Sequence, residues 1–146
     1  LMRAARALGA ETVCVEPDER RRGLVGGHAA CPERLFDTCI VAVGDPAAYR
    51  DAVTRLAPRG RLVIFSGLPP ADDGLALSLN QLHYREQALV GAYGCCHRHG
   101  VRALEAIADG SVPVADMISH RMPLAELEAA LDLVATRAGM KILLYP

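Results

Sequence analysis

Short, nearly continuous apolar runs alternate along the chain with stretches whose apolar residues recur at helical spacing. The runs are residues 11–15, 36–43, 61–66 and 87–93, and each one stops at a glycine or an acid. Runs of this length are typical of strands buried on both faces of a parallel sheet. Their alternation with helical segments predicts an α/β fold with right-handed crossover connections.

Turn and capping residues mark where the helices between these runs begin and end. Asp18 can cap a helix that runs through about Leu24 and ends at Gly26 and Gly27, and Asp45-Pro46 begins a helix through Leu56. Helical spacing also predicts helices over about 101–108 and 124–134. Residues 68–86 are expected to form a loop. The apolar stretch 140–145 is expected to be a strand with no evident partner in this chain.

The first sixteen residues match the second half of a βαβ dinucleotide-binding unit. A helix over 1–10 contains Gly9 near its end, strand 11–15 follows, and the strand ends on Glu16. The first strand and its Gly-x-Gly-x-x-Gly turn are expected upstream of Leu1, so we interpret the chain as the downstream part of a larger enzyme. Without the first strand, strand 11–15 is expected to slide against 37–43 and pair with it; the alternative is that another segment, most readily 140–145, fills the gap.

The amino-acid composition limits which residues can form the protein core and which partners the protein can attract. Hydrophobic residues make up 51% of the chain, aromatic residues only 4%, and Trp is absent, so the core must consist of Ala, Leu and Val. The net charge of −1 provides no field that would attract nucleic acid or an anionic membrane. No apolar stretch reaches the roughly 20 residues of a membrane span. Five cysteines without framework spacing suit a reducing cytoplasm, where we expect the protein to be located.

Glu16 is the first candidate for binding a cofactor. A carboxylate at the end of the second strand accepts hydrogen bonds from the ribose hydroxyls and repels a 2′-phosphate, which favours NAD over NADP. Arg20 or Arg21 could instead bind a 2′-phosphate, so NADP stays the alternative. If Glu16 binds no cofactor, it is a solvated acid at the end of a strand.

Two further groups of candidates follow the buried strands. Val43 and Gly44 end one strand, and Ser66, Gly67 and Leu68 end the next. Open α/β sheets bind ligands at the carboxyl ends of their strands, where glycine lets the backbone approach a flat ring. Ordinary strand-to-helix turns explain the same residues without a ligand.

Cys95, Cys96, His97 and His99 have donor types that suit zinc. Structural zinc sites space their cysteines by two to four residues and take a second pair from elsewhere. We therefore predict no metal site in this chain, and no catalytic residue.

Several segments together resemble the zinc-dependent medium-chain alcohol dehydrogenases, in particular the branch of sorbitol and threonine dehydrogenases. The resemblance rests on 36–44, 59–69, 83–86, 91–94 and 118–124. It implies an incomplete Rossmann domain over 1–94, and a helical segment and last strand over 95–146 that belong with a missing GroES-like catalytic domain. It also implies NAD-linked oxidation of a secondary alcohol, polyol or amino alcohol at a zinc ion whose ligands lie in that missing half.

The resemblance adds three expectations about particular residues. The backbone of Ala92 and Tyr93 binds the carboxamide of the cofactor, and Lys141 stands where the family carries a cation for the pyrophosphate. Strand 87–93 pairs with its copy across a two-fold axis, which makes a dimer or tetramer. The chain alone is expected to be inactive. Two other functions are alternatives to the dehydrogenase. The first is a non-catalytic product of a truncated or split gene that acts at most as an association module, and the second, ranked far behind, is a methyltransferase.

Overall fold

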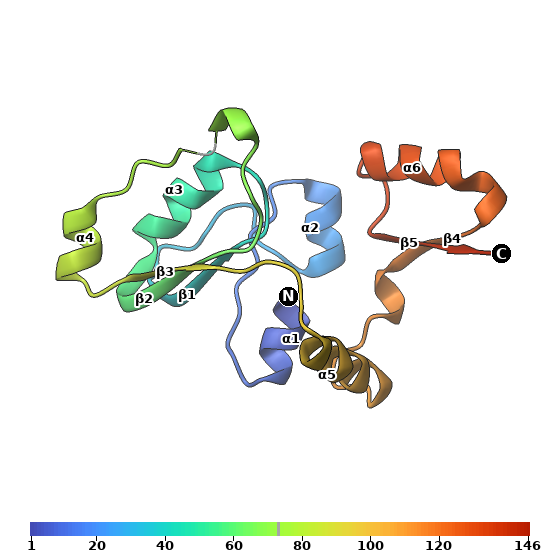
Figure 1. Ribbon diagram of the computed structural model, residues 1–146, viewed down its shortest axis with the longest axis horizontal. Coiled ribbons are helices and arrows are strands. Elements are labelled where there is room, and N and C mark those ends of the chain that lie inside the picture. The colour runs from blue at the N-terminus through green and yellow to red at the C-terminus, as the bar shows by residue number, and fades with distance from the viewer. Residues whose placement is uncertain (73) are drawn as a thin grey trace. The chain divides into compact units, whose positions relative to one another are not determined.

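A computed structural model describes residues 1–72 and 74–146 of the chain. The described residues group into two compact units (Figure 1). We call Leu1–Val13 with Cys96–Pro146 the first unit, and Cys14–Cys95 the second unit. The predicted domain division at 94 and 95 stays a prediction.

The second unit is built on a parallel sheet of three strands. These are β1 (Phe36–Val41), β2 (Leu56–Ile64) and β3 (Ala88–Gly91), in the order β1-β2-β3. They confirm the predicted strands at 36–43, 61–66 and 87–93 and the α/β class. β2 begins earlier than predicted because Leu56 already pairs with Phe36, and the register then shifts before Thr38 pairs with Arg61.

Two predicted helices of the second unit are confirmed with their caps. In α2 (Glu19–Val25), the Asp18 side chain accepts the Arg21 N–H at 2.8 Å, and Gly26 ends the helix with φ +64°. In α3 (Pro46–Thr54), Asp45 accepts the Ala47 N–H at 2.8 Å. Both caps satisfy amide groups that the first turn of a helix leaves without partners.

The core of the second unit lies where α3 covers the sheet (Figure 1). Its buried members come from α3 and from β1 and β2: Val41, Tyr49, Val53, Leu56 and Leu62. Cys39 of β1 packs against them, and burial raises the pKa of its thiol to about 11. Cys39 is therefore protonated at neutral pH and acts as a small residue that packs against the core.

The predicted loop over 68–86 is wrong in part, and its residue Asp73 lies outside the described residues. The stretch contains a short 3-10 helix, Pro70–Asp72, and the helix α4 (Leu79–Tyr84). The Ser78 hydroxyl oxygen accepts the Gln81 N–H at 3.2 Å, so Ser-x-x-Gln was a capping signal that identifies this helix. The Gln81 amide also donates to the Val53 carbonyl at 3.3 Å, which links α4 to the end of α3.

The predicted strand 11–15 and its slide against 37–43 are both wrong. Val15 forms only an isolated parallel bridge with His28. The Cys14 carbonyl accepts the His28 N–H at 2.8 Å, and the Glu16 N–H donates to the His28 carbonyl at 2.9 Å. Residue 28 follows α2 closely, so this pairing closes a short loop and costs less chain entropy than pairing with β1. Among the described residues, no segment pairs with the other edge of β1.

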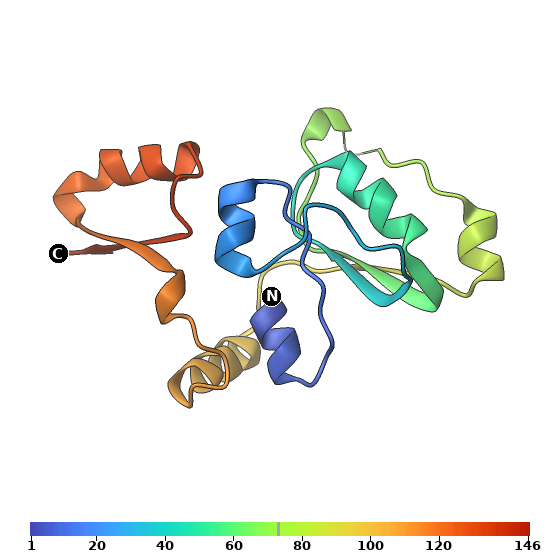
Figure 2. The same ribbon diagram turned by 180° about the vertical axis from the view of Figure 1, so that it is seen from behind.

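The first unit contains three helices and a pair of parallel strands. The helices are α1 (Met2–Ala7), α5 (His97–Ala108) and α6 (Leu127–Ala135), and the strands are β4 (Ile118–Pro123) and β5 (Lys141–Tyr145). Short 3-10 turns precede β4 (Ala115–Met117) and α6 (Leu124–Glu126). The helices were predicted, but the expectation that 140–145 has no partner is wrong, because β5 pairs with β4. Figure 2 shows α6 running along one side of this pair.

Arg3 connects the two chain segments that make up the first unit. Its guanidinium donates to both carboxylate oxygens of Asp116, at 2.5 and 2.6 Å, and to the Pro113 carbonyl at 2.5 Å. The Asp116 hydrogen bond raises the pKa of Arg3, and the same bond lowers the pKa of Asp116.

Over the described part of the chain, no helix is long and apolar enough to span a membrane.

Candidate functional site

The predicted cofactor residues of the second unit follow three strands that end at the same edge of one sheet. Val43 and Gly44 follow β1, Ser66 to Leu68 follow β2, and Ala92 with Tyr93 follows β3. Backbone bonds continue across these ends: the Ser66 N–H donates to the Val41 carbonyl at 3.1 Å, and the Ala92 N–H donates to the Ile64 carbonyl at 3.0 Å. The structure therefore brings these segments together at the edge where open parallel sheets bind ligands.

The loops that follow β1 and β2 are in direct backbone contact at two glycines. A Cβ added to Gly44 would lie 2.8 Å from the Gly67 carbonyl oxygen, so no side chain fits between these two loops. A Cβ added to Gly67 would meet nothing within 4 Å. The two glycines thus form a close backbone contact with open space beside Gly67, which is the arrangement that a planar ligand needs for close approach.

The loop after β2 is held from the core side. The hydroxyl of Tyr49, a residue that is only 2% exposed, donates a hydrogen bond to the Ser66 carbonyl. Leu68 packs against the same core cluster. Sequence analysis missed Tyr49, because its position predicts only a buried helix face and nothing in the sequence indicates its partner in the loop after β2.

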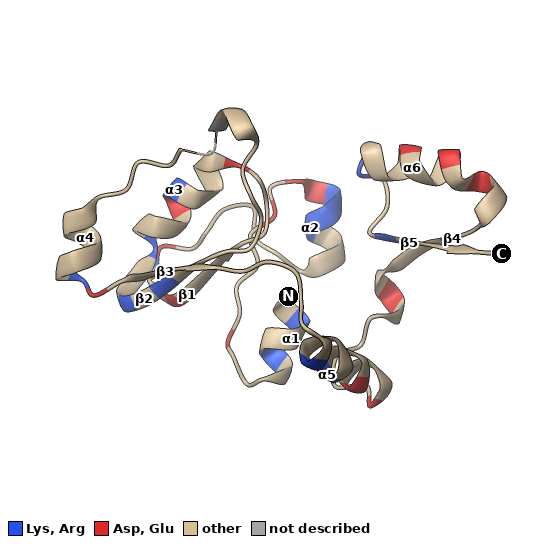
Figure 3. Cartoon of the chain, viewed as in Figure 1, with Lys and Arg blue, Asp and Glu red and all other residues tan. Residues whose placement is uncertain are grey.

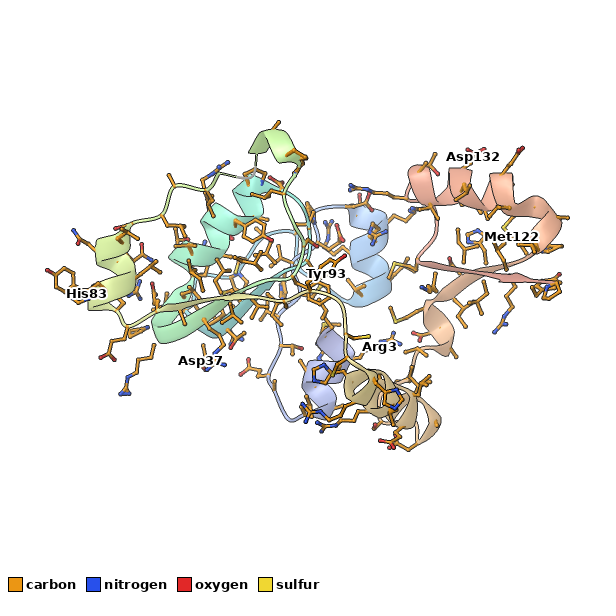
Figure 4. The ribbon with its side chains drawn as sticks, viewed as in Figure 1. Arg3, Asp37, His83, Tyr93, Met122 and Asp132 are labelled. Carbon is orange, nitrogen blue, oxygen red and sulfur yellow. The ribbon has the colours of Figure 1, made fainter. Side chains whose placement is uncertain are left out.

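Apolar side chains remain exposed next to these backbone segments. Val43 is 44% exposed and Phe65 is 49% exposed, and the side chain of Tyr93, labelled in Figure 4, is fully exposed. Exposed apolar side chains are common over the described residues, so these three do not by themselves mark a ligand site.

Glu16 is fixed in position by its own turn and by α2. One carboxylate oxygen accepts the Asp18 N–H at 3.2 Å, and the other lies 3.4 Å from Nε of Arg21. Arg22 donates to the carbonyls of Glu16 and Pro17, at 3.1 and 2.8 Å. Figure 3 shows these acidic and basic residues gathered at the beginning of α2. The sequence indicated both signs of charge here but did not indicate that Glu16 and Arg21 pair.

Lys141 belongs to the first unit, whereas all other predicted site residues belong to the second. It is the first residue of β5 and its side chain is exposed. Within the described chain no carboxylate forms an ion pair with its ammonium group, which leaves the charge available to an anion.

The described residues do not fit a zinc ion. In residues 1–72 and 74–146, no three side chains of His, Cys, Asp or Glu gather where they could hold a metal. Cys95 and Cys96 are both exposed, directly before α5. The absence of a metal site in the whole chain stays a prediction.

Comparison with known proteins shows relatives among dehydrogenases, although no family model matches the chain. Over 109 residues the chain is 36% identical to a sorbitol dehydrogenase of Bombyx mori, which covers 75% of this chain and 30% of that protein. It is 24% identical over 109 residues to an L-threonine 3-dehydrogenase of Yersinia pestis (strain Pestoides F), covering 75% of this chain and 31% of that protein. The chain therefore spans about a third of the length of these curated relatives.

Solved structures share the fold over nearly the whole chain. A zinc-binding dehydrogenase from Sinorhizobium meliloti 1021 bound to NADP matches with a TM-score of 0.79 and 21% identity, covering 99% of this chain and 48% of that one. An alcohol dehydrogenase from E. coli CFT073 complexed with NADH matches with a TM-score of 0.81 and 13% identity, also covering 99% and 48%. These structures confirm the Rossmann-type α/β fold. Together with the sequence relatives they confirm the predicted resemblance to the zinc-dependent medium-chain alcohol dehydrogenases.

Proposed function

We propose that this chain forms much of the cofactor site of an NAD-dependent dehydrogenase that oxidises a secondary alcohol, polyol or amino alcohol to a ketone. The observation that carries the proposal is the backbone contact of Gly44 with Gly67 at the carboxyl edge of the sheet, with open space beside Gly67. The relatives are named as sorbitol and threonine dehydrogenases, which supports this class of substrate. When bound, the nicotinamide accepts the hydride that leaves the alcohol carbon.

Each part of the cofactor has a candidate partner in the chain. Glu16 accepts hydrogen bonds from the ribose hydroxyls, and the loops at Gly44 and Gly67 lie against the rings. The backbone of Ala92 and Tyr93 binds the carboxamide, and Lys141 pairs with the pyrophosphate. Zinc ligands are proposed to lie outside these 146 residues, because the described residues hold no suitable group.

Two observations bear on the choice between NAD and NADP. The Glu16 carboxylate is held with one oxygen on a backbone amide, so its charge stays where it repels a 2′-phosphate. Arg21 lies 3.4 Å from the other oxygen and would partly offset that charge. One similar structure holds NADP and another holds NADH. We propose NAD as the preferred cofactor, with NADP as the alternative.

The proposed activity is tested by screening the full protein with NAD against polyols and amino alcohols. We expect zinc-dependent reduction of NAD, followed by the absorbance of the reduced nicotinamide, with at least one of these substrates. The 146-residue chain by itself is expected to be inactive because it lacks a group of metal ligands among its described residues. Full protein that binds NADH but oxidises none of these alcohols would favour the non-catalytic association module.

Replacing Glu16 tests the ribose contact. For Glu16→Ala we expect the Kd for NADH to rise on the order of tenfold, the effect of losing hydrogen bonds to a charged group, and the Kd for NADPH to change less. Glu19→Gln, at the first position of α2, is the matched control and should leave both values unchanged. A larger loss of NADPH affinity than of NADH affinity would contradict the assigned role.

Adding a methyl group at Gly67 tests whether the cofactor lies there. Since a Cβ at this position meets nothing within 4 Å, Gly67→Ala should leave the Tm nearly unchanged. It should weaken NADH binding on the order of tenfold if the ring contacts this backbone, as expected when an extra methyl crowds a packed contact. Gly100→Ala meets equally open space on α5 and serves as the control. Unchanged NADH affinity of Gly67→Ala would place the cofactor elsewhere.

Self-association through β3 is also proposed, because this strand lies at an edge of the described sheet and all its residues are exposed. The Ala92 N–H bonds to β2, and amide directions alternate along a strand, so the Val90 N–H faces β2 and the Leu89 N–H faces outward. Leu89→Pro should therefore lower the oligomeric mass of the full protein in light scattering while the subunit stays folded. Val90→Pro, by contrast, should damage the β2–β3 pairing itself. An unchanged mass for Leu89→Pro would argue against this interface.

A further inference from the structure

The turn that follows β2 is held by one contact on each of its two peptide groups. The Ser66 carbonyl accepts a hydrogen bond from the hydroxyl of Tyr49 on α3. The Gly67 carbonyl oxygen faces Gly44, where an added Cβ would come within 2.8 Å of it. Both carbonyls of the turn therefore face protein atoms, and a rotation of either peptide group would break one of these contacts.

The hydrogen bond from Tyr49 takes over where the pairing of β2 stops. The N–H groups of Phe65 and Ser66 both donate to the Val41 carbonyl, at 3.3 and 3.1 Å. Among the described residues, no backbone N–H donates to the Ser66 carbonyl, which turns to α3 instead. Tyr49 is buried in the core, so its hydroxyl donates from a fixed position.

This bond also sets the direction of the Gly67 N–H. The carbonyl and the N–H of one trans peptide group point in opposite directions, and the carbonyl that precedes Gly67 points at Tyr49. The Gly67 N–H therefore points away from that hydroxyl, and within residues 1–72 and 74–146 it donates to no carbonyl. Gly67 is exposed and space is open at its Cα, so its backbone is accessible to a ligand.

We propose that Tyr49 is a positioning residue for the cofactor, because its hydroxyl holds the Ser66–Gly67 peptide group in the orientation that presents Gly67 to the ligand. The inference rests on the proposed function, since it needs the cofactor to lie against Gly67. Tyr49 acts from the core and does not itself contact the cofactor. A surface that is fixed before binding loses less conformational freedom when the ligand arrives, so the hydroxyl increases the affinity.

The test compares the affinity of the full protein for NADH between two variants of the same core. Tyr49→Phe keeps the ring and removes only the hydroxyl, and the Kd should rise on the order of fivefold, as for one lost hydrogen bond. Val53→Ala, on the same helix and in the same core cluster, is the matched control. It leaves a cavity that lowers the Tm, but it should not change the Kd, because Val53 forms no bond to the turn. Equal losses of affinity in both variants would assign Tyr49 a purely structural role and overturn the inference.

Double variants show whether Tyr49 acts through Gly67. In a Gly67→Ala background, where the contact with the cofactor is already disturbed, Tyr49→Phe should cause little further loss of NADH affinity. In a Glu16→Ala background the two losses should multiply, because Glu16 is proposed to bind a different part of the cofactor. An undiminished effect of Tyr49→Phe in the Gly67→Ala protein would contradict the positioning role.

Tyr49→Met provides a second variant in case Tyr49→Phe does not fold. It also lacks the hydroxyl, and its flexible apolar side chain can fill much of the space that the ring leaves. The same rise of the Kd is expected. If neither variant folds, the fold itself requires the hydroxyl, and the positioning role is overturned.

The outcomes also separate this inference from the proposed function. If Gly67→Ala weakens NADH binding and Tyr49→Phe does not, the positioning role is wrong and the proposed function stands. If Gly67→Ala leaves NADH binding unchanged, the cofactor does not lie against this turn, and the role of Tyr49 is overturned with that assignment. If the full protein binds no NADH at all, the proposed function itself is wrong.

Discussion

The parallel pairing of β1 with β2 is the constraint on which the candidate site depends. It aligns the carboxyl ends of two strands, so that Gly44 and Gly67, which are far apart in sequence, lie with their backbones in contact. The packing of α3 on the sheet supports this edge, because Tyr49 of α3 is buried in the core and also bonds the Ser66 carbonyl. The same residues that make the core of the second unit therefore hold the surface proposed to bind the cofactor.

Local signals in the sequence were sufficient wherever the structure is decided locally. Asp18 and Asp45 cap the helices that follow them, and apolar runs form β1, β2 and β3. The predicted residues at the carboxyl edge come together because parallel strands leave little freedom in where their ends lie. Even the missed helix α4 had a local signal, Ser78 followed by Gln81.

Pairing between distant segments could not be predicted in the same way. Residues 118–123 entered the sequence analysis only as part of a family motif, and nothing in their pattern indicated that β5 would pair with them. Residues 11–15 showed the opposite failure, since an apolar run that resembles a strand forms a single bridge to His28. The Arg3–Asp116 pair joins residues more than a hundred positions apart, and charge alone does not select one acid among many. Sequence patterns describe the faces of an element, whereas its partner depends on the rest of the fold.

Arg21 and Lys141, the two cationic residues considered as cofactor ligands, differ in whether a carboxylate lies beside them. Arg21 already lies beside the Glu16 carboxylate, so any anion that it binds must compete with a charge a few ångströms away. Lys141 has no carboxylate partner among the described residues, and its backbone is held by Ser119 instead. A cation without a neighbouring carboxylate attracts an anion with its full field, whereas a carboxylate beside a cation offsets much of that attraction. An anion that approaches Arg21 therefore also meets the Glu16 carboxylate, whereas no carboxylate of the described residues opposes an anion at Lys141.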